Sequence, residues 1–224
     1  MKYKYFDIIL GLFVAVLLIS NIASTKILDL GPFTFDGGTI LFPIIYIFGD
    51  ILTEVSGYKV ARRVIWTGFV SALLMSAVLF IVGKLPAAAE WEFQESYNNI
   101  LGLTSRIVIA SLIAYLVGEF SNSYIMAKLK VKMKGKKLWV RTIGSTVVGE
   151  GFDTVIFVMI AFWGILPSSL ILSIIISNYI FKVLFETLAT PITYFVTKQL
   201  KQKENMDHYD RDTDFNPFVL KENN

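Results

Sequence analysis

The sequence has no cysteine, a single histidine and few charged residues, and each shortage removes a class of function. Without cysteine, the chain forms neither disulfides nor thiolate metal sites. His208 lies in a polar C-terminal stretch, which argues against a histidine-based catalytic or metal site. Charged residues make up 17% of the chain, against about 25% in soluble proteins. The sequence therefore predicts that the protein is not an enzyme and that it uses no metal and no cofactor.

Apolar residues, 54% of the chain, are collected in long runs that short charged stretches separate. A helix that crosses a bilayer needs about 20 mostly apolar residues. The first run lacks a clear cleavage site of small residues, so it is predicted to be a membrane helix and not a signal peptide. The chain is therefore predicted to be an all-α membrane protein with six transmembrane helices. The six runs are 8–25, 39–55, 64–83, 104–127, 142–163 and 168–197.

Basic residues are concentrated at the N-terminus, in the connections 59–63 and 128–141, and after the last run. The third connection is acidic instead, with Glu90, Glu92 and Glu95. Lysine and arginine favour the cytoplasmic side, so a multi-pass protein of the cell (inner) membrane is predicted, with both termini cytoplasmic. The lysine-rich stretch 128–137 could also suggest RNA binding. Anchoring to anionic lipid is the favoured interpretation, and no nucleic-acid partner is expected.

The composition changes near the C-terminus and divides the chain into two parts. Residues 1–203 are predicted to form the transmembrane domain. Residues 204–224 form an acidic, polar, proline-containing cytoplasmic tail. By composition the tail is expected to be either disordered or docked at the periphery.

Several charged residues lie inside the apolar runs. With a rise of about 1.5 Å per residue, Asp50 and Asp153 lie roughly 17 Å along their helices and Lys182 roughly 21 Å, close to the middle of the membrane. Charge at that depth usually faces a partner or a cavity. A polar site inside the helix bundle is therefore predicted. The other ionisable residues at or near this depth are Glu119, Glu150 and Glu186.

Spacing leaves some of these assignments open. Lys182 and Glu186 are four residues apart and could form a structural salt bridge with each other. Glu54 lies close to the inner interface, where an ion pair is favoured over a ligand role. Arg106, near the outer interface, could be an anchor or a gate. Gly149 and Gly151 flank Glu150, which suits either close approach of a ligand or tight helix packing.

The chemistry of the predicted site follows from its excess of carboxylates. Ionised carboxylates only accept hydrogen bonds, so they favour a solute that is rich in donors or cationic. Aromatic residues nearby could stack on a flat ring, although most of them are expected to pack against other helices or lipid.

Two stretches carry a resemblance to a known family. Residues 42–58 read FPIIYIFGDILTEVSGY and residues 61–66 read ARRVIW, and they resemble the queuosine precursor transporters, which are vitamin-uptake-transporter-like membrane proteins. The resemblance covers most of the chain. Further matching stretches are 106–107, 118–119, 145–146, 153–154, 161–164, 181–183 and the tail at 207–210 and 213–218.

The resemblance implies a six-helix fold similar to the substrate-binding subunits of energy-coupling-factor vitamin transporters. It implies import of 7-cyano-7-deazaguanine or its aminomethyl relative, the deazapurine precursors of the tRNA nucleoside queuosine. A deazaguanine presents adjacent donors that a carboxylate can accept bidentately. The site residues carried over are Asn21, Asp50, Arg106, Glu119, Asp153 and Lys182. Glu150 is added to the predicted site because of its depth alone. The resemblance does not support it, because some family members carry an amide at that position.

Other functions remain open at this point. The chain could be a substrate-binding subunit that needs a separate ATPase module, since it contains no Walker motif. An intramembrane diaspartyl protease using Asp50 and Asp153 is disfavoured, because Phe48-Gly49 before Asp50 does not match the pattern of such enzymes. A purely structural role leaves the charges at mid-membrane depth unexplained. The sequence leaves a homodimer open and does not reveal the driving force of transport.

Overall fold

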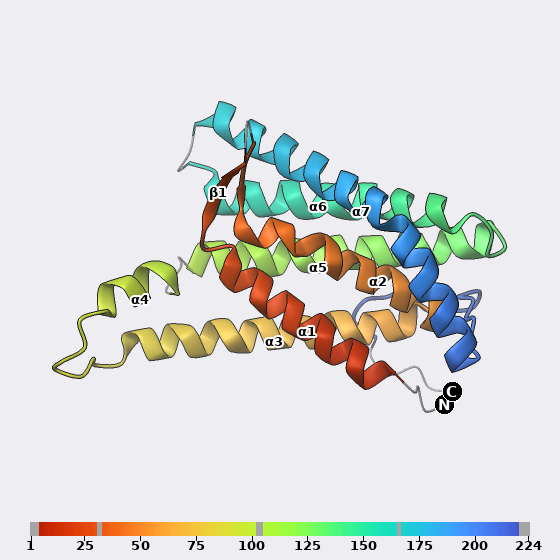
Figure 1. Cartoon of the computed structure of the whole chain (residues 1–224), viewed down its shortest axis with the longest axis horizontal. Coiled ribbons are helices and arrows are strands. Elements are labelled where there is room, and N and C mark those ends of the chain that lie inside the picture. Colours follow the sequence, from red (N-terminus) through yellow and green to blue (C-terminus); the bar gives the residue numbers. More distant parts are fainter. Residues whose placement is uncertain (1–4, 31–32, 102–104, 165–166, 220–224) are drawn as a thin grey trace.

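The computed structural model describes residues 5–30, 33–101, 105–164 and 167–219, with the side chains of 27, 29, 30, 33, 34, 36 and 105–108 excepted. Each of the six predicted runs overlaps one long helix, which confirms that each run is helical, although the third of these helices begins at Tyr58 and so includes the predicted connection 59–63. Figure 1 shows them side by side, running between two ends of the molecule. These helices are α1 (Phe6–Ala23), α2 (Phe42–Ser56), α3 (Tyr58–Lys84), α5 (Ser105–Lys132), α6 (Leu138–Phe162) and α7 (Ser168–Glu204).

Among the described residues, α1, α3, α6 and α7 are long and apolar enough to cross a membrane. The chain is therefore a multi-pass membrane protein. The remaining two long helices differ from these four. α2 has 15 residues, about 22 Å of helix, and α5 buries Glu119, Asn122 and Ser123 in its middle.

One end of the molecule contains elements that the sequence did not predict. Strands β1 (Ile27–Leu30) and β2 (Phe33–Asp36) pair in antiparallel register, with Ile27 opposite Asp36. The short 3-10 helix η1 (Gly37–Ile40) follows the hairpin, and α4 (Gln94–Ile100) lies at the same end of the molecule (Figure 1). The Phe35 ring lies 5.2 Å from that of Phe181, so the hairpin packs on α7. The fold is thus helical apart from one hairpin.

The start of α2 differs from the predicted helix boundary. The second run was expected to be helical from residue 39, but η1 ends at Ile40 and α2 begins at Phe42. Pro43 occupies the first turn of α2, a position where its missing N–H leaves no helical hydrogen bond unmade. The proline therefore favours the start of a helix there and does not interrupt one.

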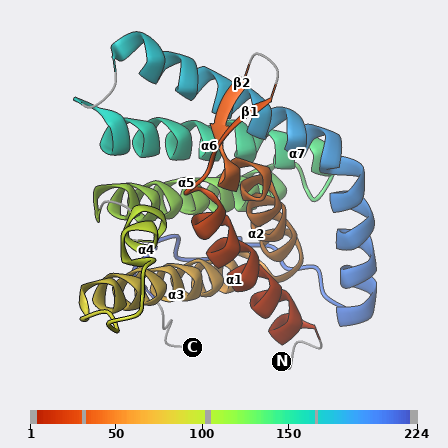
Figure 2. The same ribbon diagram turned by 60° about the vertical axis from the view of Figure 1, so that its left-hand side comes forward.

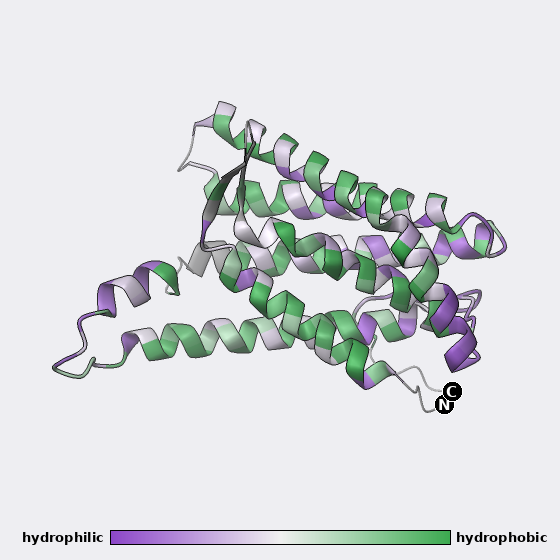
Figure 3. Cartoon of the chain, in the orientation of Figure 1, coloured by the Kyte–Doolittle hydropathy of each residue, from purple (hydrophilic) through white to green (hydrophobic). Residues whose placement is uncertain are grey.

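The distribution of polarity is the reverse of that in a soluble protein. Large apolar residues such as Leu74 (63% exposed) and Leu188 (80%) cover the outside, and Figure 3 shows hydrophilic residues gathered mainly at the two ends. Polar residues occupy the inner faces. On α7 this buried face consists of Asn178, Lys182, Glu186, Thr190, Thr193 and Thr197. Burial of polar groups away from lipid is what a bilayer requires.

Glycines allow α5 and α6 to pack very closely. A Cβ atom on Gly149 would lie 3.0 Å from the carbonyl oxygen of Gly118 and 2.8 Å from Cβ of Asn122. Small residues at such crossings let membrane helices approach each other. For Gly149, the tight-packing interpretation is therefore the one that the structure bears out.

Helix α7 changes direction in its second half (Figure 2), and Pro191 lies inside it. Proline removes a backbone donor and commonly bends a helix. The helix also continues to Glu204, beyond the predicted end at residue 197.

The C-terminal tail is docked against the bundle, which is one of the two states that its composition suggested. The backbone N–H of His208 donates to the carbonyl of Val55, and the backbone N–H of Tyr58 donates to the Asp210 carboxylate at 3.0 Å. Between them lies Gly57, with φ of 84°, a conformation that glycine adopts without steric cost. The tail therefore packs on the turn that joins α2 and α3.

Candidate functional site

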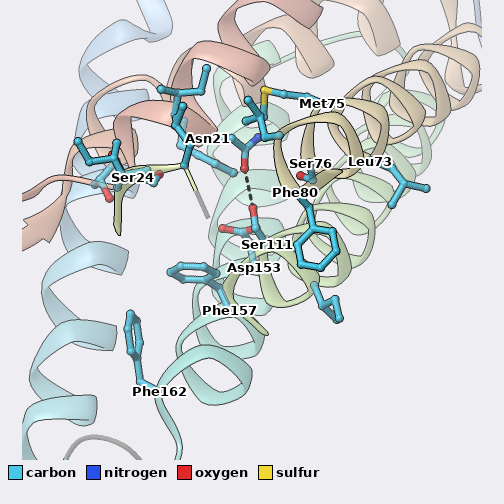
Figure 4. Close-up of a pocket in the computed structure, with 18 of the residues that line it drawn as sticks. Asn21, Ser24, Leu73, Met75, Ser76, Phe80, Ser111, Asp153, Phe157 and Phe162 are labelled. Carbon is cyan, nitrogen blue, oxygen red and sulfur yellow. Dashed lines mark hydrogen bonds between the residues drawn. The ribbon is translucent and has the colours of Figure 1, made fainter. Parts of the chain in front are cut away.

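A cavity of about 460 Å³ lies toward the hairpin end of the bundle. Its volume is within the range of small-molecule sites, roughly 300–1,000 Å³. Figure 4 shows Leu73, Met75, Ser76 and Phe80 of α3 along one side, with Asp153 and Phe157 of α6 across from them. Residues of α1, α5 and α7 also line it.

A buried ion pair forms part of the cavity wall. Nζ of Lys182 lies 2.7 Å from Oδ2 of Asp153 and 3.0 Å from Oε2 of Glu150. The ammonium group also lies 4.7 Å from the centre of the Phe42 ring. Asp153 and Lys182 are only 3% and 6% exposed. Lys182 therefore joins α7 to α6 and presents a charged pair to whatever occupies the cavity.

Two buried polar side chains beside this pair have free hydrogen-bonding capacity. Oγ1 of Thr154 and Oδ1 of Asn178 have no hydrogen-bond partner among the described residues, and both residues line the cavity. A buried polar atom without a partner is costly. A polar solute in the cavity would satisfy both atoms.

Asn21 contributes to the cavity from α1. Its Oδ1 accepts a hydrogen bond of 3.0 Å from the Ser111 hydroxyl of α5, and its Nδ2 donates to the carbonyl of Leu17. The first of these bonds is the dashed line in Figure 4. Ser111 therefore fixes the orientation of the Asn21 amide at the cavity wall.

The predicted site residues separate into three groups. Asn21, Asp153 and Lys182 line the cavity, and Glu150 contacts Lys182. Asp50 and Glu119 are fully buried but lie outside the cavity wall. The side chain of Arg106 lies outside the described residues.

Two of the buried charged residues have partners that spacing did not identify. Oδ1 of Asp50 accepts a hydrogen bond of 2.8 Å from Asn122, and Asp50 does not line the cavity. A Lys182–Glu186 salt bridge within α7 was left open by the sequence. Lys182 instead turns to α6, and Glu186 accepts a hydrogen bond from Thr146.

Glu54 behaves as an ion-pair residue, with partners that spacing did not identify. Its carboxylate is bound by the Arg141 guanidinium, and its Oε1 lies 2.6 Å from Nζ of Lys201. Arg62, in the first turns of α3, donates hydrogen bonds to the backbone of the tail. Glu54 lies in the last turn of α2 and Lys201 in the last turn of α7, at the end of the bundle where α1 begins (Figure 1).

Sequence reasoning missed several residues of the cavity. Thr154 follows Asp153 directly, and Asn178 lies one helical turn before Lys182. Residues three or four apart share a helix face, so the spacing from Lys182 was a usable signal for Asn178. Ser111 lacked such a signal, because it meets Asn21 only through the packing of α5 on α1.

The chain is similar to a family of membrane transporters and to several individual transporters. Residues 36–196 match the family "Putative vitamin uptake transporter". A "Probable queuosine precursor transporter" of Bacillus subtilis is 29% identical over 199 residues, which cover 87% of each chain. The "Queuosine precursor transporter" of Escherichia coli is 28% identical over 56% of this chain and 54% of its own length. None of the solved structures matches this chain.

The family match covers most of the helical bundle, from β2 into the second half of α7. It includes Asp153 and Lys182, the charged pair of the cavity. The cavity, the buried polar helix faces and the apolar exterior are the features that a solute carrier requires. The chain therefore belongs to the "Putative vitamin uptake transporter" family of membrane transporters.

Proposed function

We propose that this protein imports a queuosine precursor, 7-cyano-7-deazaguanine or its aminomethyl form, across the cell membrane for tRNA modification. The observation that carries the proposal is the Asp153–Lys182 pair, which lines a cavity of suitable size beside two unpaired polar atoms. The proposal is supported by the B. subtilis, E. coli and Haemophilus influenzae relatives, whose names state queuosine precursor transport.

The chemistry of the cavity suits a deazaguanine. The ring N–H and the exocyclic amino group lie side by side and can donate to one carboxylate, which is the role we assign to Asp153. Lys182 can donate to the ring carbonyl. Phe42 and Phe157 line the same cavity and offer apolar faces to a flat ring. Thr154 and Asn178 supply the remaining polar contacts.

We further propose six membrane spans with both termini in the cytoplasm. α2 and α5 run alongside the four apolar helices, and the start of α1 and the end of α7 lie at one end of the molecule (Figure 1). The lysine-rich connection between α5 and α6 is at that same end, in agreement with the preference of basic residues for the cytoplasm. Under this topology the cavity opens toward the outside. The likeness to energy-coupling-factor substrate-binding subunits stays a prediction.

A homodimer stays a prediction from the sequence. The alternative to a self-sufficient carrier is a substrate-binding subunit that depends on a separate ATPase module. Uptake by the purified chain alone, in liposomes without ATP, would exclude that alternative.

The direct test is binding by the purified protein in detergent. Thermal-shift and equilibrium binding should rank 7-cyano-7-deazaguanine and the aminomethyl form above guanine. Asp153→Asn should weaken binding by at least about 100-fold, because a charge-assisted bidentate contact is lost. Glu92→Gln, in an exposed connection, is the matched control and should bind normally. Unchanged affinity in folded Asp153→Asn would overturn the proposal.

A further inference from the structure

Five buried carboxyl groups lie in the interior of the bundle, and one of them, Asp153, forms part of the cavity wall. Each of them is at most 3% exposed. Lys182 is the one cation that forms ion pairs with them among the described residues, and it contacts only Glu150 and Asp153. The five are Asp50 of α2, Glu119 of α5, Glu150 and Asp153 of α6, and Glu186 of α7. We call this set the carboxyl cluster.

Glu119 is the member of the carboxyl cluster with the fewest partners. It is 0% exposed, and neither carboxyl oxygen has a hydrogen-bond partner among the described residues. It packs so closely on α2 that a Cβ atom on Gly49 would lie 2.8 Å from its Oε2. A buried carboxyl group without a partner binds a proton rather than remain charged. The titratable groups that face it are Asp50 and Tyr46 of α2, Tyr115 of α5, Glu150 and Asp153 of α6, and Glu186 of α7.

A second buried polar group without a partner lies at the same place. The hydroxyl group of Tyr46 is fully buried and has no hydrogen-bond partner among the described residues. A Cβ atom on Gly118 would meet both this hydroxyl group and Cβ of Asp153. A hydroxyl group can donate to an ionised carboxylate and accept from a protonated one. Tyr46 therefore has the chemistry to pass a proton to a member of the carboxyl cluster that comes within hydrogen-bond distance of it.

Lys182 connects this cluster to the cavity. It neutralises both Asp153, in the cavity wall, and Glu150. A solute that engages Asp153 and draws the ammonium group toward its own carbonyl leaves Glu150 without its counter-ion. An uncompensated buried carboxylate favours proton binding, so solute binding and proton binding each strengthen the other.

We propose that the carboxyl cluster carries one proton inward with each solute, so that uptake is a proton symport. The proton enters from the outer solution, resides on a cluster carboxyl group while the solute is bound, and is released to the cytoplasm. No covalent bond of the solute changes. The inference rests on the proposed function, since it concerns the same cavity.

Proteoliposomes that contain the full chain distinguish solute transport itself from its coupling to protons. Exchange of labelled for unlabelled 7-cyano-7-deazaguanine at equal pH measures transport alone. Accumulation at zero membrane potential with the outside acidic measures coupling, and a dye in the lumen measures proton entry. For one proton per solute we expect about tenfold accumulation for each pH unit, with lumen acidification on solute addition. A protonophore should abolish the accumulation.

Substitutions of Glu119 test whether its carboxyl group carries the proton. Glu119→Gln should lose the pH-driven accumulation while exchange remains measurable, and Glu119→Asp should restore part of it. Glu90→Gln, exposed in the connection after α3, should match the wild type in both assays. Exchange without any effect of the pH gradient in the wild type would refute the symport and leave the proposed function intact. Absence of exchange would refute the proposed function itself. Full accumulation in Glu119→Gln would remove Glu119 as the carrier.

Discussion

Nζ of Lys130, near the end of α5, lies 2.6 Å from Oδ1 of Asp207 in the C-terminal tail. Nζ of Lys201, in the last turn of α7, lies 2.8 Å from the same oxygen. Lys130 also donates a hydrogen bond to the backbone carbonyl of His208. One tail carboxylate therefore joins two helices that are far apart in the sequence. The ion pairs of Glu54 with Arg141 and Lys201 lie beside it.

The surroundings of Asp207 predict a pH dependence. Partial burial raises the pKa of Asp207, but hydrogen bonds from Lys130 and Lys201 outweigh it and leave the pKa below its usual value. A carboxyl group with a lowered folded-state pKa stabilises the protein above its unfolded pKa, and this contribution is lost as the pH falls through the folded value. The difference in Tm between wild type and Asp207→Asn should thus persist from neutral pH to about pH 5. Thermal melts in detergent measure it, and a difference that vanishes by pH 6 would contradict the assignment.

Arg62 is expected to be essential for docking of the tail. It is fully buried, and its guanidinium group donates to the backbone carbonyls of Asp214 at 2.9 Å and Asn216 at 2.7 Å. Hydrogen bonds from a charged donor contribute about 1.5–3 kcal/mol, so Arg62→Gln should lower stability by about 3 kcal/mol. It should also make the tail sensitive to added protease. Exposed Arg63 is the adjacent control, and Arg63→Gln should change neither property.

The crossing of α5 and α6 predicts opposite effects for two glycines of α6. A Cβ atom on Gly149 would lie 2.8 Å from Asn122 Cβ, whereas a Cβ atom on Gly144 would meet nothing nearer than 3.6 Å. Gly149→Ala should therefore destabilise the protein by about 1–3 kcal/mol through overpacking. Gly144→Ala should stabilise it by up to about 1 kcal/mol through helix propensity. Equal Tm values for the two variants would show that the crossing is looser than the structure has it.

A substitution at Thr154 should weaken solute binding without lowering the stability of the protein. Its hydroxyl group is buried, lines the cavity and has no partner among the described residues. Thr154→Val removes that hydroxyl group with little change of shape, so the protein should be as stable as before or more so. Solute binding should weaken by about tenfold, because one hydrogen bond to the solute is lost. Thr187→Val, on the exposed side of α7, is the control. Normal binding with Thr154→Val would place the solute elsewhere in the cavity.

The tail and the hairpin illustrate why part of the fold could not be predicted from the sequence. The long apolar runs predicted the six long helices, because an apolar run of about 20 residues is the length of helix that a bilayer requires. The tail has no such constraint. Its order depends on Arg62, Trp66 and Lys130, which lie far away in the sequence and meet it only after the helices pack. The hairpin strands are four residues each, too short for periodicity to distinguish them from a helix.

The sequence by itself determined that charged groups would lie at a common depth inside a helical bundle. Depth follows from counting residues along a helix of fixed rise. Only the tertiary structure decided which of those groups would meet, because contacts between helices depend on how each helix is rotated about its axis. That rotation directs Lys182 to Asp153 and Glu150 rather than to Glu186. It also leaves Asp50 and Glu119 outside the cavity wall, although both belong to the carboxyl cluster that reaches the wall at Asp153.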